Sequence, residues 1–244
     1  LDVYSLWESL QAIMGYLEEE DPNAFQTARE AMKCFEPYGG EGQEYALSTR
    51  FVPEGCRKEV TDLLTEIMNK SQVYNSDREH VFSTEQNAIT AKNAEEYYRQ
   101  MVSGGNKTWN LRDEHMMDTL DRLLDFHGPG SKAIVWAHNT HIGDASYTDM
   151  AGRGLFNIGE LARNRHGRDS VALIGLGSYQ GSVLAGEAWG EPVQKMRLPA
   201  GRSGSWEELC HDAGDQFFIF SDDIRNMEEL QKLLPHRAVG VVYH

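Results

Sequence analysis

A short apolar run that ends in two histidines places the strongest constraint on the fold of this chain. Residues 132–137 read Lys-Ala-Ile-Val-Trp-Ala, follow a Gly-Pro-Gly turn, and are succeeded by His138 and His141. A run of this length between turn residues is typical of a buried strand. In open α/β sheets, ligands bind beyond the carboxyl ends of the strands. The sequence therefore predicts a functional site at the two histidines.

The first hundred residues carry the pattern of amphipathic helices. Apolar residues recur at helical spacing in four stretches, which cover about residues 4–17, 25–35, 60–67 and 78–101. Such a pattern predicts a bundle or layer of four to five helices joined by short loops. The glycine-rich turn at Ser103–Asn106 is the clearest boundary in the chain. We therefore predict a helical subdomain at residues 1–104 and a second domain at residues 105–244.

The second domain reads as alternating helices and strands. A helix capped by Asn110 precedes the central run, and a helix over about Asn157–Arg165 separates that run from a second apolar segment at residues 170–175. A strand, helix, strand order favours a parallel crossover. Further strands are expected at residues 181–185, 193–198, 217–220 and 238–243, with a helix starting at Ser205. The predicted fold class is α/β, a mostly parallel sheet flanked by helices, with the large helical subdomain attached.

Composition excludes several classes of function. The 23 basic and 38 acidic residues give a net charge of −15, which argues against binding to a nucleic acid backbone. No apolar run approaches the roughly 20 residues needed to span a bilayer, so no membrane partner is expected. Cys34, Cys56 and Cys210 are odd in number and lack C-x-x-C spacing, which favours buried thiols in a reducing, cytoplasmic setting.

The chemistry available to the histidine pair has three interpretations. Because imidazole titrates near neutral pH, His138 and His141 can act as general base and oxyanion partner. Alternatively, one or both can satisfy backbone carbonyl groups in the turn. A zinc site with Asp144 or Asp149 is a weaker hypothesis, since no recognisable spacing fixes a third ligand.

Other polar residues are candidates for the same site. Arg112 begins a helix that leads toward the central run and can hold a carboxylate or polarise a carbonyl, although an Arg–Asp surface or interdomain pair is the favoured interpretation. A loop with Arg202 and Ser205, together with His211, either covers the site or merely caps a helix. We also assign Asn139 and Asp144, which follow the central run, to substrate binding. A G-x-S-x-G nucleophile elbow is absent from the sequence.

Four segments together resemble the erythromycin esterase family, some members of which are named succinoglycan biosynthesis protein. They are Asn-Leu-Arg-Asp-Glu-His-Met at 110–116, Trp-Ala-His-Asn-Thr-His-Ile-Gly-Asp at 136–144, Asn-Ile-Gly at 157–159 and Gly-Arg-Ser-Gly-Ser at 201–205. The resemblance implies an α/β core with a helical insertion and hydrolysis of an ester, in the best-known members the lactone of a macrolide. It also implies that histidine and acidic residues activate water without a serine nucleophile. His138 and His141 match the family's strand-end histidines, with Arg112 as a neighbour.

One family signature is missing. The Gly-Glu-x-Thr-His-Gly stretch, which the resemblance assigns a histidine base and a glutamate, does not occur in this sequence. A sheet without its first strands would expose an unpaired edge, so we expect a fragment of a longer hydrolase.

The leading hypothesis is a metal-independent esterase for a small-molecule ester or lactone, with no cofactor and with Arg112 supporting the developing charge. Its alternatives are a metal-assisted hydrolase that uses both histidines and an aspartate, and a polysaccharide- or metabolite-binding homologue that has lost catalysis.

Overall fold

The computed structural model describes residues 2–39, 42–51, 55–74, 77–102, 105–188, 191–214, 234–240 and 242–243. The chain divides into two compact units. The first consists of Leu1–Trp136 and His141–Leu173, and the second of Ala137–Thr140 and Ile174–His244. The expected subdomain boundary at Ser103 and Gly104 lies outside the described residues.

The first unit is helical. Its helices up to the central run are α1 (Leu6–Glu20), α2 (Pro22–Phe35), α3 (Gly42–Ser48), α4 (Arg57–Lys70), α5 (Arg78–Met101) and α6 (Asn106–His127). Short helices follow as α7 (Asn139–Ile142), whose first two residues belong to the second unit, α8 (Asp149–Gly152) and α9 (Ile158–His166). Single 3-10 turns lie at Glu36–Tyr38, Ser71–Val73, Ala145–Tyr147 and Arg168–Ser170. The expectation of four to five helices before residue 102 is confirmed by α1 to α5.

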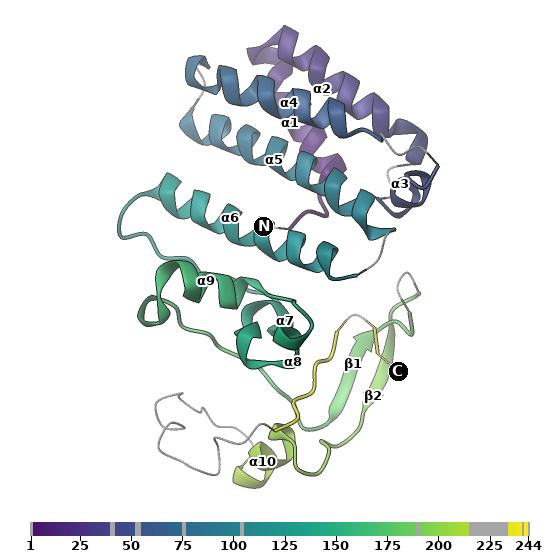
Figure 1. Cartoon of the computed structure of the whole chain (residues 1–244), viewed down its shortest axis with the longest axis vertical. Coiled ribbons are helices and arrows are strands. Elements are labelled where there is room, and N and C mark those ends of the chain that lie inside the picture. Colours follow the sequence, from purple (N-terminus) through teal and green to yellow (C-terminus); the bar gives the residue numbers. More distant parts are fainter. Residues whose placement is uncertain are drawn as a thin grey trace. The chain divides into compact units, whose positions relative to one another are not determined.

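The core of this unit follows from the helical repeat of apolar residues. Leu6, Leu10, Ile13 and Leu17 recur every three or four positions on α1 and are fully buried. Burying each of these side chains contributes about 1.5–3 kcal/mol. The buried face of α5 carries small alanines, which let α1 and α4 pack against it. In Figure 1, α6 lies between α5 and α9, and it packs against both.

A disulfide corrects the expectation about cysteines. Cys34 on α2 and Cys56, directly before α4, are joined by a disulfide with a Cα separation of 5.8 Å. The prediction of buried free thiols is therefore wrong for these two residues, and only Cys210 keeps its thiol. The physical reason is that α2 packs against α4, which brings together cysteines 22 residues apart. Sequence spacing of the C-x-x-C kind does not report on such a contact.

The predicted parallel sheet is not found in the described part of the chain. Residues 132–137 and 170–175 form no strand. Val135 and Val171 pack against the apolar cluster between α6 and α9, whereas Ile134 and Trp136 are 95% and 87% exposed. The central run thus has one face on the helices, but no described strand pairs with its backbone. Apolar character predicted the packing of one face only, and it does not show which segment could supply the hydrogen-bonded neighbour that a strand needs.

The second unit contains a small antiparallel sheet. Strands β1 (Gly181–Ala185) and β2 (Gln194–Leu198) pair in register from Gly181 opposite Leu198 to Ala185 opposite Gln194. This confirms the two expected strands. Helix α10 (Trp206–Ala213) follows, as Figure 1 shows.

The remaining predictions for this unit fare differently. In the described part of the expected strand at 238–243, Val242 forms an isolated parallel bridge with Gly186. The predicted strand at Phe217–Phe220 lies outside the described residues. No helix in the described ranges has both the length and the apolar character to cross a bilayer.

Candidate active site

A buried aspartate holds one of the two predicted histidines. Asp113, on α6, is fully buried, and His141, on α7, is 8% exposed. Nδ1 of His141 lies 2.9 Å from Oδ1 and 3.0 Å from Oδ2 of Asp113. An ionised carboxylate can only accept hydrogen bonds, so Nδ1 of His141 carries the proton and donates it. The pair is therefore a histidine oriented by a carboxylate, both removed from solvent.

Two further groups fix this pair. The backbone N–H of Ile158 donates to Oδ1 of Asp113 at 3.0 Å. The indole of Trp109 stacks on the imidazole of His141, with ring centroids 4.4 Å apart and planes 4° from parallel. Nε1 of Trp109 in turn donates to the carbonyl of Phe156 at 2.7 Å, which holds the indole in place. The imidazole is thus restrained along one edge and across one face.

Burial and hydrogen bonding act in opposite directions on Asp113. Removal from water raises the pKa of this carboxyl group, while the hydrogen bonds from His141 and from the Ile158 amide lower it, and the net result is a raised pKa. Nε2 of His141 makes no hydrogen bond to any residue that the structure describes. With Nδ1 protonated, Nε2 carries the lone pair, so it is the atom that can accept a proton.

The other predicted histidine is bound differently. Nε2 of His138 donates to the carbonyl of Val239 at 2.6 Å, and Nδ1 lies 3.2 Å from the N–H and 2.9 Å from Oγ1 of Thr140. Both ring nitrogens are therefore engaged. This is the arrangement in which a histidine satisfies a backbone carbonyl. The division of the chain falls between the two residues, since His138 belongs to the second unit and His141 to the first.

Arg112 forms an ion pair with the N-terminal segment. Its guanidinium contacts both carboxylate oxygens of Asp2, with Nε at 2.8 and 2.9 Å and Nη2 at 2.6 Å. It also lies 4.7 Å from the ring centre of Tyr4. The Arg–Asp pair that sequence reasoning considered therefore exists, but its acidic member is Asp2 and not the adjacent Asp113.

Asn139 and Asp144 are occupied by internal contacts. The side chain of Asn139 bonds both backbone groups of Leu176. Asp144 accepts from Nη1 of Arg163 at 3.1 Å and from Ser146, and these bonds lower its pKa against the effect of burial. Both side chains thus join segments of the chain in this structure, and their assignment to substrate binding stays a prediction.

The loop candidates lie in the second unit. Ser205 caps α10 by accepting from the N–H of Glu208 at 3.3 Å, which is the simpler of the two interpretations offered for it. The Arg202 carbonyl accepts from the Ser205 N–H at 3.1 Å in the preceding turn. The imidazole of His211 stacks on Tyr179 with ring centroids 3.8 Å apart. Their roles in substrate binding likewise stay predictions.

Sequence reasoning missed two members of the cluster in the first unit. Asp113, next to Arg112, was not assigned to the site, and Trp109 was assigned no role. A signal existed, because Trp109 and Asp113 are four residues apart and therefore share one face of α6. That Ile158 contributes a backbone amide could not be found in this way, since it comes from another helix.

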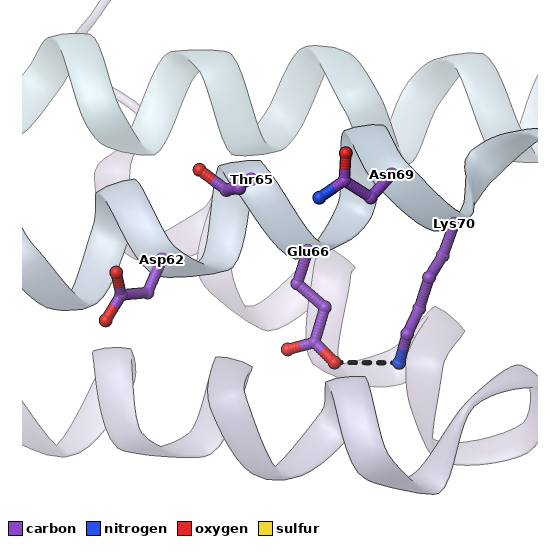
Figure 2. Close-up of a pocket in the computed structure, with 5 residues that line it drawn as sticks. All are labelled: Asp62, Thr65, Glu66, Asn69 and Lys70. Carbon is purple, nitrogen blue, oxygen red and sulfur yellow. Dashed lines mark hydrogen bonds and ion pairs between the residues drawn. The ribbon is translucent and has the colours of Figure 1, made fainter.

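Two surface pockets lie elsewhere in the first unit. One is lined by Asp62, Thr65, Glu66, Asn69 and Lys70, all on α4, and the other lies around the turn after α6. Figure 2 shows the Lys70 ammonium turned toward Glu66, 2.7 Å from its carboxylate; Asp21 binds the same ammonium at 2.9 Å. The cation in the α4 pocket is thus already neutralised. Within the described ranges, no three His, Cys, Asp or Glu side chains are grouped so as to hold a metal ion.

Three solved structures share the fold of this chain. A Bacillus cereus protein matches with a TM-score of 0.79 and 17% identity, over 100% of this chain and 59% of its own. A succinoglycan biosynthesis protein matches with a TM-score of 0.67 and 16% identity, over 87% and 48%. A mutant of the erythromycin esterase EreC in its open conformation matches with a TM-score of 0.65 and 17% identity, over 87% and 56%. The chain thus spans about half of each matched structure.

The fold of this chain therefore resembles the folds of EreC and of a succinoglycan biosynthesis protein. The sequence profile of the erythromycin esterase family matches residues 1–244. The chain belongs to the erythromycin esterase family, as its motifs indicated.

Proposed function

We propose that this chain supplies the Asp–His pair of an ester hydrolase in which His141 is the general base. The observation that carries the proposal is the buried hydrogen bond between Asp113 and Nδ1 of His141, which leaves Nε2 free to accept a proton. A carboxylate in this position holds the productive tautomer and stabilises the imidazolium that forms. Membership of the erythromycin esterase family supports the same reaction class.

The reaction balances with water as the only co-substrate. Nε2 of His141 takes a proton from a water molecule as the oxygen of that water adds to the ester carbonyl carbon. The tetrahedral intermediate then collapses, the carbon–alkoxide bond breaks, and the imidazolium returns its proton to the leaving oxygen. The products are a carboxylic acid and an alcohol, which in a lactone are the two ends of one opened ring.

The other predicted residues take subordinate places in this proposal. Arg112 can support the charge that develops on the carbonyl oxygen only if it exchanges contacts with Asp2 for that role. We propose that His138 orients neighbouring groups, because its ring nitrogens are engaged. The substrate we propose to test first is a macrolide lactone, on the strength of the name of EreC alone.

The test is hydrolysis by the natural full-length protein, with erythromycin and a p-nitrophenyl ester as substrates. His141→Gln removes the base, and we expect kcat to fall by about 10³-fold or more. Asp113→Asn keeps the shape of the side chain but removes its charge and replaces one acceptor oxygen by an NH2 donor, which favours the wrong tautomer of His141, and we expect a loss of about 10²- to 10⁴-fold.

The matched control is His166→Gln. His166 is a half-exposed histidine whose Nε2 binds Asp121 on α6, and we expect its replacement to change kcat less than twofold. Full activity of the His141→Gln protein, or equal losses in the control and in both site variants, would overturn the assignment of the base.

A further inference from the structure

The segment Asn157-Ile158-Gly159 contacts Asp113 and the turn that follows His141, although it contributes no side chain to the chemistry. It forms the junction between an extended loop and α9, and all three residues are buried. Each residue makes a different contact with Asp113 or with the turn that follows His141.

Asn157 ties the start of α9 to the turn after His141. Its side chain is 1% exposed. Oδ1 accepts from the N–H of Glu160 at 3.0 Å, which caps α9, and from the N–H of Ala145 at 3.3 Å. One carbonyl oxygen therefore joins two chain segments. A side chain without this acceptor would leave both amides without that bond.

Ile158 acts through its backbone. Its N–H lies in the first turn of α9, where backbone amides have no partner within the helix. It donates to Oδ1 of Asp113 at 3.0 Å. The positive end of the helix dipole favours a carboxylate at this place. The position of α9 therefore determines where the Asp113 carboxylate is held relative to His141.

Gly159 lets the two backbones approach each other. A Cβ atom at this position would overlap the carbonyl oxygens of Gly143 and Ile142 and would lie 2.7 Å from the carbonyl carbon of Ile142. The obstructing atoms are backbone and cannot turn aside as a side-chain end can. Gly159 has a helical conformation that alanine adopts readily, so the requirement for glycine is the contact and not the dihedral angles.

We propose that Asn157-Ile158-Gly159 is the positioning element of the Asp113–His141 pair. It fixes the Asp113 carboxylate through the Ile158 amide. It fixes the turn that follows His141 through Asn157 and the close packing at Gly159. The proposal rests on the proposed function only where activity is the readout, because the geometry of the pair can be measured by itself.

The first experiment compares Gly159→Ala with Gly15→Ala in the full chain. Gly15 lies inside α1 with open space around its Cα, so alanine there tests the same exchange without an obstruction. The ¹⁵N shifts of the His141 imidazole, assigned with His141→Gln, report which ring nitrogen carries the proton. Wild type and Gly15→Ala should show the proton on Nδ1. In Gly159→Ala the Nδ1-protonated fraction should fall, with unchanged helix content by circular dichroism.

Activity gives the second readout. In the natural full-length protein, Gly159→Ala should lower kcat by about 100-fold with KM within twofold, since misplacement of a catalytic group by about 1 Å costs this much. Gly15→Ala should stay within twofold of wild type. A folded Gly159→Ala protein with the wild-type tautomer would overturn the positioning role, whatever its activity. If no ester is hydrolysed even by the wild type, the proposed function fails, while the tautomer measurement still decides the positioning role.

A second pair of variants covers the case in which Gly159→Ala does not fold. Asn157→Asp keeps an oxygen that can accept from both amides, whereas Asn157→Ala removes it. We expect the Nδ1-protonated fraction of His141 to fall in Asn157→Ala and to be restored in Asn157→Asp. Wild-type tautomer ratios in both variants would contradict the proposal as firmly as an unaffected Gly159→Ala.

Discussion

His115 offers the sharpest prediction about stability, because it is a buried histidine outside the Asp–His pair. It lies on α6, is 3% exposed, and accepts at Nδ1 from Nδ2 of Asn93 at 2.9 Å. Nε2 is buried and has no hydrogen-bond partner among the described residues. Burial lowers the pKa of His115 to about 4, and the charge of Arg122 acts in the same direction, while the carboxylates of Asp2 and Asp118 oppose it.

The consequence is a loss of stability in acid. An unfolded histidine has a pKa of about 6.5. Between that pH and about 4, the unfolded chain binds a proton at His115 that the folded chain does not bind. The free energy of unfolding therefore falls as the pH is lowered through this window, by about 1.4 kcal/mol per unit and about 3 kcal/mol in all. Above pH 6.5 the residue is neutral in both states and adds no pH dependence.

The assay is urea unfolding of the full chain, followed by circular dichroism at pH 7.5, 6, 5 and 4. His115→Asn keeps an acceptor for Asn93 but cannot be protonated. At pH 7.5 the free energy of unfolding of His115→Asn should be lower than that of wild type, because the smaller side chain leaves space in the core. Between pH 7.5 and pH 4 the wild type should lose about 3 kcal/mol more than the variant. Other groups, such as Asp113, titrate in both proteins and cancel in the comparison.

The control for this assay is His80→Asn, which changes an exposed histidine on α5 and should give a curve parallel to wild type. If the curves of His115→Asn and wild type are also parallel, the argument from burial is refuted.

Two further predictions concern stability. Reduction of the Cys34–Cys56 bond, or replacement of both residues by serine, should lower the free energy of unfolding by about 3 kcal/mol, because the bond closes a loop across 22 positions; an unchanged Tm with and without reductant would contradict this. Trp136→Gln should change the stability of this chain by less than about 0.5 kcal/mol, since the side chain is 87% exposed, whereas Val135→Ala should cost about 1 kcal/mol. Equal losses in chemical denaturation would show that Trp136 is buried after all.

The helices could be predicted because the apolar pattern that defines each one lies within a single stretch of sequence. An apolar stripe such as Leu6, Leu10, Ile13 and Leu17 requires only one packed face, and any neighbouring helix can supply the other side. The central run required more, because a strand is defined by its partner. Val135 packs against the helices, as expected for a buried run. No described strand pairs with the run, however, and the side chains on its other face are exposed to solvent. The hydrophobic periodicity and the composition of a segment do not show which other segment will pair with it.

The site was predictable to the same degree. The position of His141 after an apolar run made it a candidate, and the four-residue spacing of Trp109 and Asp113 could have added the two side chains that contact it. That His138, three residues away, would use both ring nitrogens could not be read from spacing, because its partner Val239 is a hundred residues distant. The Cys34–Cys56 bond was missed for the same reason. It depends on which helices pack together.

The contrast between the two histidines explains why the hydrogen bonds of a histidine are more informative than its place in a motif. His138 donates from Nε2 to a carbonyl and uses its lone pair at Nδ1, so it can take a proton only by giving up a bond. His141 donates from Nδ1 to Asp113 and keeps Nε2 free of described partners, so proton uptake strengthens its bond to the carboxylate. The same carboxylate is held by the Ile158 amide and excluded from water, which prevents it from turning away to solvent. A charge formed at His141 would therefore meet a fixed counter-charge, which is what the proposed role of His141 as a base in a buried site requires.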